Sequence, residues 1–297
     1  MLIVLAAAVV IVLVLRRRRA SAMRAVTQRH RRLGPGGIVV GGEPFTLHRP
    51  SAPAILLLHG GGDTPQSMRY LGDELYARGY HVEAPLLPGH GRSLREFARV
   101  TADELTACAR NSYESLRRSH GTAAVMGLSM GGALAVQIAA EHPELPALVL
   151  LAPYLAMPTR VERAVRWAWF WGPLLTAVRS GDGASILDPA ERELGLAYGV
   201  FTPAALRALR DTMVRANAVL DRVRAPTLVI QSRGDNRITS ADTERAFARL
   251  GAPVKRLDWT TGAGHVITVD YGRDAVIRDS ADWIERWISR SGSDAVD

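Results

Sequence analysis

A serine stands between two glycines at the joint of two apolar elements. Ser129 is the centre of the sequence GLSMG, which follows a strand-like run over residues 122–126 and begins a helix-like run over residues 129–142. At such a tight strand-to-helix turn the serine hydroxyl is exposed above the sheet. Glycines are needed on both sides, because a Cβ there would collide with the neighbouring strand or with the helix. The pattern predicts that Ser129 is a nucleophile.

A serine hydroxyl needs a base that takes its proton, and the base needs a third group that orients it. After Ser129 the chain contains two histidines, His142 and His265. His142 ends the helix that Ser129 begins, about 20 Å away by helical rise, so it lies too far from the hydroxyl. His265 follows the last predicted strand, residues 254–259, in a loop. We therefore predict His265 as the base.

The orienting acid is predicted to be Asp235, in the polar loop directly after the strand predicted over residues 226–231. The other downstream carboxylates are weaker candidates, because they lie within a predicted strand, at the start of a helix or in a helical segment outside the sheet: Asp258, Asp270, Asp211 and Asp221. Ser129, Asp235 and His265 each follow the carboxyl end of a predicted strand. In a parallel sheet these ends meet at one edge.

An acyl-transfer site also needs two backbone N–H groups that stabilise the oxyanion. One is predicted from Met130, the residue after the nucleophile. The second is expected from the HGGG loop over residues 59–62, where glycines let the backbone approach a substrate closely. Gly61 is the predicted donor, with Gly60 or Gly62 as alternatives.

Strands and helices alternate along most of the chain, which predicts an α/β fold with a mostly parallel central sheet and helices on both faces. The alternation stops over residues 153–224, where the sequence is helix-like or irregular. We interpret this stretch as a helical cap insertion over the carboxyl edge of the sheet, where open α/β folds bind ligands. Gly-Pro-Gly-Gly before residue 38 marks a linker, so the α/β domain with its cap insertion is expected over residues 38–297.

Five motifs support a family resemblance between about residues 54 and 288: LLLHG, APLLPGHG, GLSMGG, APTLVIQSRGDNRI and GHVITVD. The chain resembles the α/β-hydrolase superfamily, and more narrowly the bacterial carboxylesterase and monoacylglycerol lipase group. The resemblance implies a triad of Ser129, Asp235 and His265, with Gly61 and Met130 forming the oxyanion hole. The group usually has a bulky residue where Gly61 stands, so the acyl pocket is expected to differ.

These features predict a serine hydrolase that cleaves carboxylic esters of lipophilic substrates, such as monoacylglycerol-like lipids, through an acyl-enzyme. No cofactor or metal is expected. Two alternatives remain open. The same triad could cleave another bond (an amide, a thioester or a carbon–carbon bond), or the chain could be a non-catalytic binding protein with an α/β-hydrolase fold.

The net charge of +8 comes from the N-terminus. No Asp or Glu precedes Glu43, whereas eight arginines lie between residues 16 and 32, so the rest of the chain carries 29 cations against 29 anions. A basic arm on a neutral domain does not indicate nucleic-acid binding. The partners expected are a small lipophilic ester and, through the arm, a membrane.

Residues 2–15 are uninterruptedly apolar and are followed by four arginines. Although a helix of this length spans about 21 Å against ~30 Å of hydrocarbon, we predict a transmembrane anchor over residues 1–15 and an Arg-rich juxtamembrane linker over residues 16–37. The positive-inside rule then predicts a single-pass cell-membrane protein with a cytoplasmic catalytic domain. The alternative is a secretory signal cleaved near Ala20-Ser21-Ala22.

Overall fold

The computed structural model describes residues 10–15, 17, 21, 32–172, 177–179 and 185–293. Its centre is a seven-stranded sheet in the order β1-β3-β2-β4-β5-β8-β9. Neighbouring strands are parallel except for β1 and β3, which are antiparallel. The predicted α/β fold with a mostly parallel sheet is confirmed. The strands are β1 (Phe45–Leu47), β2 (Ala54–Leu58), β3 (His81–Ala84), β4 (Ala123–Leu128), β5 (Leu148–Leu151), β8 (Thr227–Ser232) and β9 (Lys255–Thr260).

Strand β2 is buried along its whole length because helices cover both faces of the sheet. Leu56 and Leu58 point to one face, and Ile55 and Leu57 point to the other. A strand enclosed on both sides therefore reads as a continuous apolar run rather than as an alternating one.

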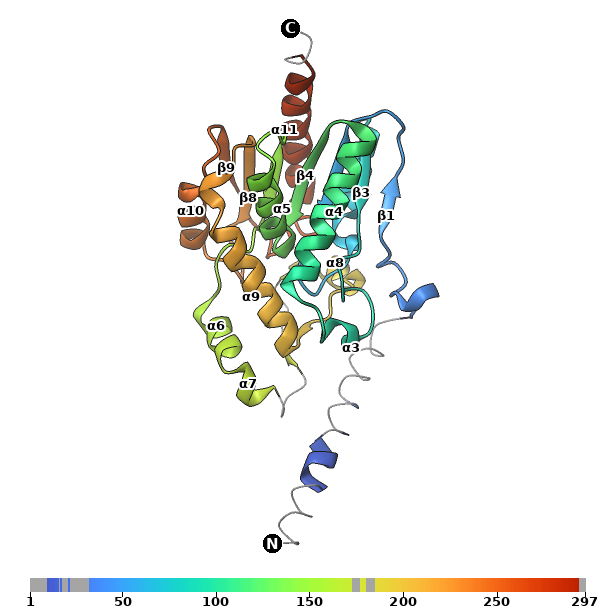
Figure 1. Ribbon diagram of the computed structural model, residues 1–297, viewed down its shortest axis with the longest axis vertical. Coiled ribbons are helices and arrows are strands. Elements are labelled where there is room, and N and C mark those ends of the chain that lie inside the picture. Colours follow the sequence, from blue (N-terminus) through green and yellow to red (C-terminus); the bar gives the residue numbers. More distant parts are fainter. Residues whose placement is uncertain are drawn as a thin grey trace.

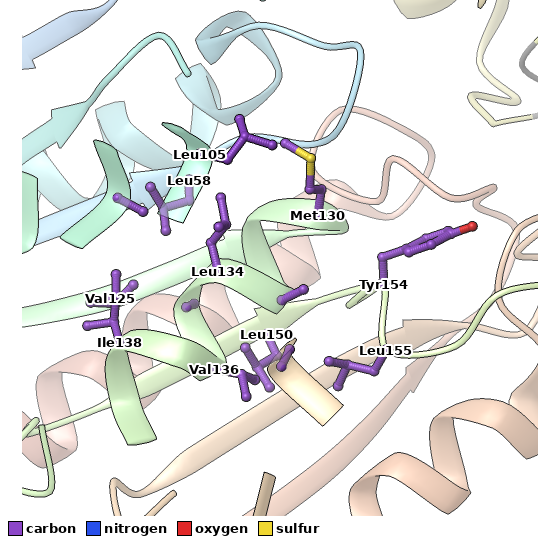
Figure 2. Close-up of a cluster of buried hydrophobic side chains, with 14 of the residues drawn as sticks. Leu58, Leu105, Val125, Met130, Leu134, Val136, Ile138, Leu150, Tyr154 and Leu155 are labelled. Atoms are coloured by element: carbon purple, nitrogen blue, oxygen red, sulfur yellow. The ribbon is translucent and has the colours of Figure 1, made fainter. Parts of the chain in front are cut away.

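Helices α4 (Ala102–His120), α5 (Met130–Glu141) and α10 (Ser240–Arg249) cover one face, and α2 (Arg69–Ala77) and α11 (Arg273–Ser293) cover the other (Figure 1). Every residue of α5 from Met130 to Ala140 is buried. Figure 2 shows its Leu134, Val136 and Ile138 within the apolar cluster formed with β4 and β5. The helix that follows Ser129 is thus fixed in the core.

The predicted helical cap insertion lies between β5 and β8. It contains α6 (Thr159–Arg166), α7 (Ala168–Trp171), β6 (Val178–Arg179), α8 (Pro189–Leu194), β7 (Val200–Phe201), α9 (Pro203–Asn217) and the short 3-10 helix η3 (Leu220–Arg222). Strands β6 and β7 form a separate antiparallel pair. Two-residue strands carry no periodic pattern, so neither strand was predicted.

Several short elements were also not predicted. They are β1, the helix α3 (Leu94–Phe97), and the 3-10 helices η1 (Pro35–Gly37) and η2 (Pro65–Met68). Helix α3 is stabilised by a capping box, in which the Ser93 side chain accepts from the Glu96 N–H and the Glu96 side chain accepts from the Ser93 N–H. Domain limits at residues 38, 153 and 224 stay predictions.

The predicted single-pass location in the cell membrane is wrong. No helix within the described ranges is long and apolar enough to cross a membrane. Residues 10–15 are helical. Residues 1–9 of the predicted anchor lie outside the described residues. The cytoplasmic orientation and the membrane contact of the Arg-rich linker both depended on that anchor, so neither prediction stands.

Two glycines allow α5 to begin directly above β2 and β4. A Cβ on Gly131 would lie 2.0 Å from the carbonyl oxygen of Leu58, and one on Gly127 would lie 2.2 Å from the carbonyl oxygen of Gly131. Both distances are far below van der Waals contact, and the atoms that would be struck belong to the backbone. The collision that the sequence predicts for a larger residue at these positions is therefore present.

We expect Gly131→Ala to lower the free energy of unfolding by at least ~3 kcal/mol or to prevent soluble expression, because the backbone of β2 must move. Gly36→Ala is the matched control. Gly36 has a φ of 68° and open space around its Cβ position, so its substitution costs about 1 kcal/mol of backbone strain. Denaturant unfolding of both variants measures the difference. Equal losses would contradict the close-approach argument.

Candidate active site

Ser129 has a backbone conformation that non-glycine residues rarely adopt, with φ of 53° and ψ of −113°. Its carbonyl accepts hydrogen bonds from the N–H groups of Gly132, Ala133 and Tyr154, and its own N–H donates to Leu151. These four bonds hold the strained turn in place. The turn places the Ser129 side chain on the wall of a cavity.

The structure brings Ser129, His265 and Asp235 into contact from three separate loops. His265 Nε2 lies 2.7 Å from Ser129 Oγ, and His265 Nδ1 lies 2.7 Å from Asp235 Oδ2. The Asp235 carboxylate can only accept, so it assigns the proton to Nδ1. His265 Nε2 is then free to accept the Ser129 hydroxyl proton. The Asp235 side chain is fully buried, and that of His265 is 9% exposed.

Asp235 is held by more than its histidine. Oδ1 accepts the N–H groups of Arg237 at 2.6 Å and Ile238 at 3.1 Å, and Oδ2 accepts Gln231 Nε2 at 2.6 Å. Burial alone would raise the pKa of Asp235. The charge and hydrogen bond of His265 and the two N–H groups outweigh burial and hold that pKa below its ordinary value of 3.8. Asp235 therefore stays charged at neutral pH.

Gly61 and Met130 offer two free backbone N–H groups beside Ser129. Within the described part of the chain, neither N–H has a hydrogen-bond acceptor. Met130 is the first residue of α5, where the helix itself supplies no acceptor. A Cβ on Gly61 would lie 3.3 Å from Met130 Sδ, so the two residues are neighbours. This arrangement suits the predicted oxyanion hole.

His59 supports the loop that carries Gly61, a role that the sequence reasoning missed. It is fully buried, its Nδ1 lies 2.9 Å from the Gly60 carbonyl, and its Nε2 accepts the Leu87 N–H at 3.1 Å. Burial, followed by the nearby charge of His90, lowers the pKa of His59 to about 3. Burial likewise lowers the pKa of His90 to about 4. A polar residue directly after a fully apolar strand was the available signal.

A cavity of about 600 Å³ lies between the carboxyl edge of the sheet and the cap. Gly61, Ser129 and His265 line it from the sheet side. The cap contributes apolar side chains, namely Val161, Ala164, Phe201, Leu206 and Leu209, and two arginines, Arg160 and Arg179. A third arginine, Arg237, lines the cavity from the loop after β8. Among the described residues, no group of three or more His, Cys, Asp or Glu side chains could hold a metal ion.

Residues 49–271 match the family model described as "Serine aminopeptidase, S33". The chain belongs to this family. The matched region begins before β2 and ends after His265, so it contains Ser129, Asp235 and both predicted oxyanion donors.

Three similar proteins place the chain among the esterases and lipases of the α/β-hydrolase fold. A thermostable monoacylglycerol lipase of Bacillus sp. (strain H-257) is 29% identical over 84% of this chain and 96% of its own. A carboxylesterase of Bacillus subtilis (strain 168) is 28% identical over 84% and 98%. The solved structure of a metagenome-derived lipolytic enzyme, from work on LipS and LipT, has a TM-score of 0.77 at 30% identity and covers 84% of this chain and 99% of its own. The predicted resemblance is confirmed.

The lowered pKa of His59 has a consequence for stability. In the unfolded chain a histidine binds a proton below about pH 6.5, whereas folded His59 stays neutral down to about pH 3. The free energy of unfolding therefore falls as pH drops through this window, by about 1.4 kcal/mol per pH unit for one histidine. We expect His59→Gln to reduce the slope of stability between pH 6.5 and 5 by about that amount.

Denaturant unfolding at several pH values measures this slope. Leu87→Ala is the control, because it removes a buried side chain next to His59 but no titrating group. It should lower stability at every pH and keep the wild-type slope. A His59→Gln slope equal to that of the wild type would contradict the assignment of a buried, neutral His59.

Proposed function

We propose that the protein is a serine hydrolase that cleaves carboxylic esters of lipophilic substrates through Ser129, His265 and Asp235. The observation that carries this proposal is the pair of 2.7 Å contacts that joins Ser129 Oγ to His265 and His265 to Asp235. The names of the relatives, a monoacylglycerol lipase and a carboxylesterase, support the same bond type.

The positions of these groups support the following steps of acyl transfer. His265 Nε2 takes the Ser129 proton as Oγ attacks the ester carbonyl, and Asp235 stabilises the imidazolium that forms. The N–H groups of Gly61 and Met130 bind the oxyanion of the tetrahedral intermediate. His265 then gives its proton to the leaving alcohol. A water, activated by the same histidine, releases the acid from the acyl-enzyme.

The cavity favours an apolar acyl or alcohol group. Leu209 lines it near Gly61, and Gly61 itself adds no side chain there. Burying one methylene group contributes about 0.8 kcal/mol. A chain that fills this space therefore binds more tightly than a short acyl group. Monoacylglycerol-like esters fit this requirement.

The charges around the cavity argue against an aminopeptidase, the activity in the family's description. Such an enzyme needs an uncompensated carboxylate for the substrate ammonium group. The cavity wall carries three arginines against two acidic residues, Asp63 and Glu191, and Glu191 is paired with Arg273 at 2.6 Å. A like-charged wall disfavours an ammonium group. An ester without a cationic end is the better substrate class.

We expect Ser129→Ala to reduce hydrolysis of a medium-chain p-nitrophenyl ester by about 10⁴-fold or more, because no nucleophile remains. Circular dichroism should be unchanged. Fluorophosphonate should label the wild type and leave the variant unlabelled. A variant that kept a tenth of the activity would show that Ser129 is not the nucleophile, and an unlabelled, inactive wild type would favour a non-catalytic binding protein.

We expect Asp235→Asn to lower kcat by about 10²–10⁴-fold, because the amide favours the wrong tautomer of His265. Asp258→Asn is the matched control. Asp258 lies on β9 and its carboxylate pairs with Arg256 at 2.7 Å, so kcat should change less than about twofold. Initial rates on the same ester measure both. The reverse ranking would assign the acid to Asp258. Amide and thioester analogues in the same assay test the alternative bonds.

A further inference from the structure

We propose that Asp270 is a positioning residue for this reaction, which holds the backbone on either side of His265 in register with the cap. The inference rests on the proposed function, since it concerns the geometry of the same base. From the sequence, Asp270 was only a weaker candidate for the acid, because it lies at the start of a predicted helix. In the structure it is 1% exposed and lies beneath the loop that carries His265.

The carboxylate of Asp270 accepts four backbone N–H groups from three segments. Oδ1 accepts from Asp188 at 2.9 Å and from Tyr271 at 2.8 Å. Oδ2 accepts from Leu187 at 2.8 Å and from Gly264 at 2.7 Å. No cationic side chain among the described residues lies within salt-bridge distance of it. Both oxygens are thus used to fix backbone.

The Gly264 bond matters because this residue directly precedes His265. On the other side, the N–H of Val266 donates to the carbonyl of Ser185 at 2.9 Å. The residues on either side of His265 are therefore held through their backbone N–H groups, Gly264 by Asp270 and Val266 by Ser185 of the cap. A 2.7 Å contact between Nε2 and Ser129 Oγ requires this backbone to stay within a fraction of an ångström.

The cap segment over residues 185–188 also reaches the acid loop. Ser185 Oγ accepts Arg237 Nε at 3.0 Å and Nη2 at 2.9 Å. The N–H of Arg237 in turn donates to Asp235 Oδ1. Residues 185–188 therefore contact the loops of both Asp235 and His265, and Asp270 is the side chain that fixes this segment to the base loop.

A carboxylate is the group that this position requires. Four N–H donors need two acceptor oxygens, and an asparagine would turn an NH₂ group toward two of them. An alanine would leave all four donors without this acceptor, including the buried N–H of Gly264. Either change should let the His265 loop move relative to Ser129 and Asp235.

The test compares Asp270→Asn with Asp274→Asn, each titrated with fluorophosphonate to count active sites. Asp274 lies in the first turn of α11 with its side chain 96% exposed, so it is a matched control. We expect Asp270→Asn to lower kcat per titrated site by about 10- to 100-fold, while KM changes less than about threefold. The rate of fluorophosphonate labelling should fall by a similar factor, and Asp274→Asn should match the wild type in every measurement.

Proton NMR supplies a readout that a purely structural role would not change. In the wild type, the His265 Nδ1 proton shared with Asp235 should give a far-downfield signal, which should weaken or broaden in Asp270→Asn. If Asp270→Asn only lowers the melting temperature, and kcat per site and the NMR signal are unchanged, the inference is wrong. The Ser129→Ala experiment tests the proposed function separately, because its result depends on the nucleophile and not on Asp270.

A second pair of variants applies if Asp270→Asn does not fold. Asp188 has a φ of −62°, which proline adopts, so Asp188→Pro removes one N–H donor and keeps the Asp270 carboxylate. Asp188→Ala is its control, because both lose the side chain that caps α8 and only the proline loses the N–H. We expect kcat to fall several-fold more in Asp188→Pro than in Asp188→Ala. Equal kcat values would overturn the inference.

Discussion

Ser129 keeps its strained turn because its carbonyl accepts three backbone N–H groups and its own N–H is bonded to the end of the neighbouring strand. Packing in the core stabilises this strained turn, because α5 is buried along nearly its whole length and cannot shift to relieve the strain. The glycines at positions 127 and 131 let that helix sit against β2 and β4 at backbone contact. The position of Ser129, the proposed nucleophile, is thus set by packing against the sheet.

The proposed base, His265, and the proposed acid, Asp235, need a different kind of support, because both lie on loops. Asp235 acts through charge: it is buried, and its pKa is held low by His265 and by backbone N–H groups. Asp270 is also buried, yet its four hydrogen bonds go to backbone N–H groups and not to Ser129 or the imidazole. Asp235 would orient the ring of His265, and Asp270 would hold the backbone that carries this histidine.

The cap links substrate choice to this geometry. Its helices provide the apolar wall of the cavity, and its residues 185–188 contact both catalytic loops. A segment that lines the cavity on one side and contacts the loop of the proposed base on the other would couple substrate binding to the position of that base. The likeness to a monoacylglycerol lipase and a carboxylesterase covers most of the chain, including this cap.

Local patterns along the chain were enough to predict part of the fold and of the candidate site. The GLSMG turn, the alternation of strands and helices, and the order of Ser129, Asp235 and His265 can all be read along the chain, because each depends on residues next to it. The contacts of His59 and Asp270, in contrast, could be recognised only in the tertiary structure. His59 bonds to Leu87, and Asp270 joins residues 187 and 188 to residue 264, so their partners are distant in sequence. The apolar run at the N-terminus led to a wrong prediction of a membrane span. Its composition shows only that the run is hydrophobic, whereas crossing a bilayer also requires a helix of sufficient length, and no such helix is found among the described residues.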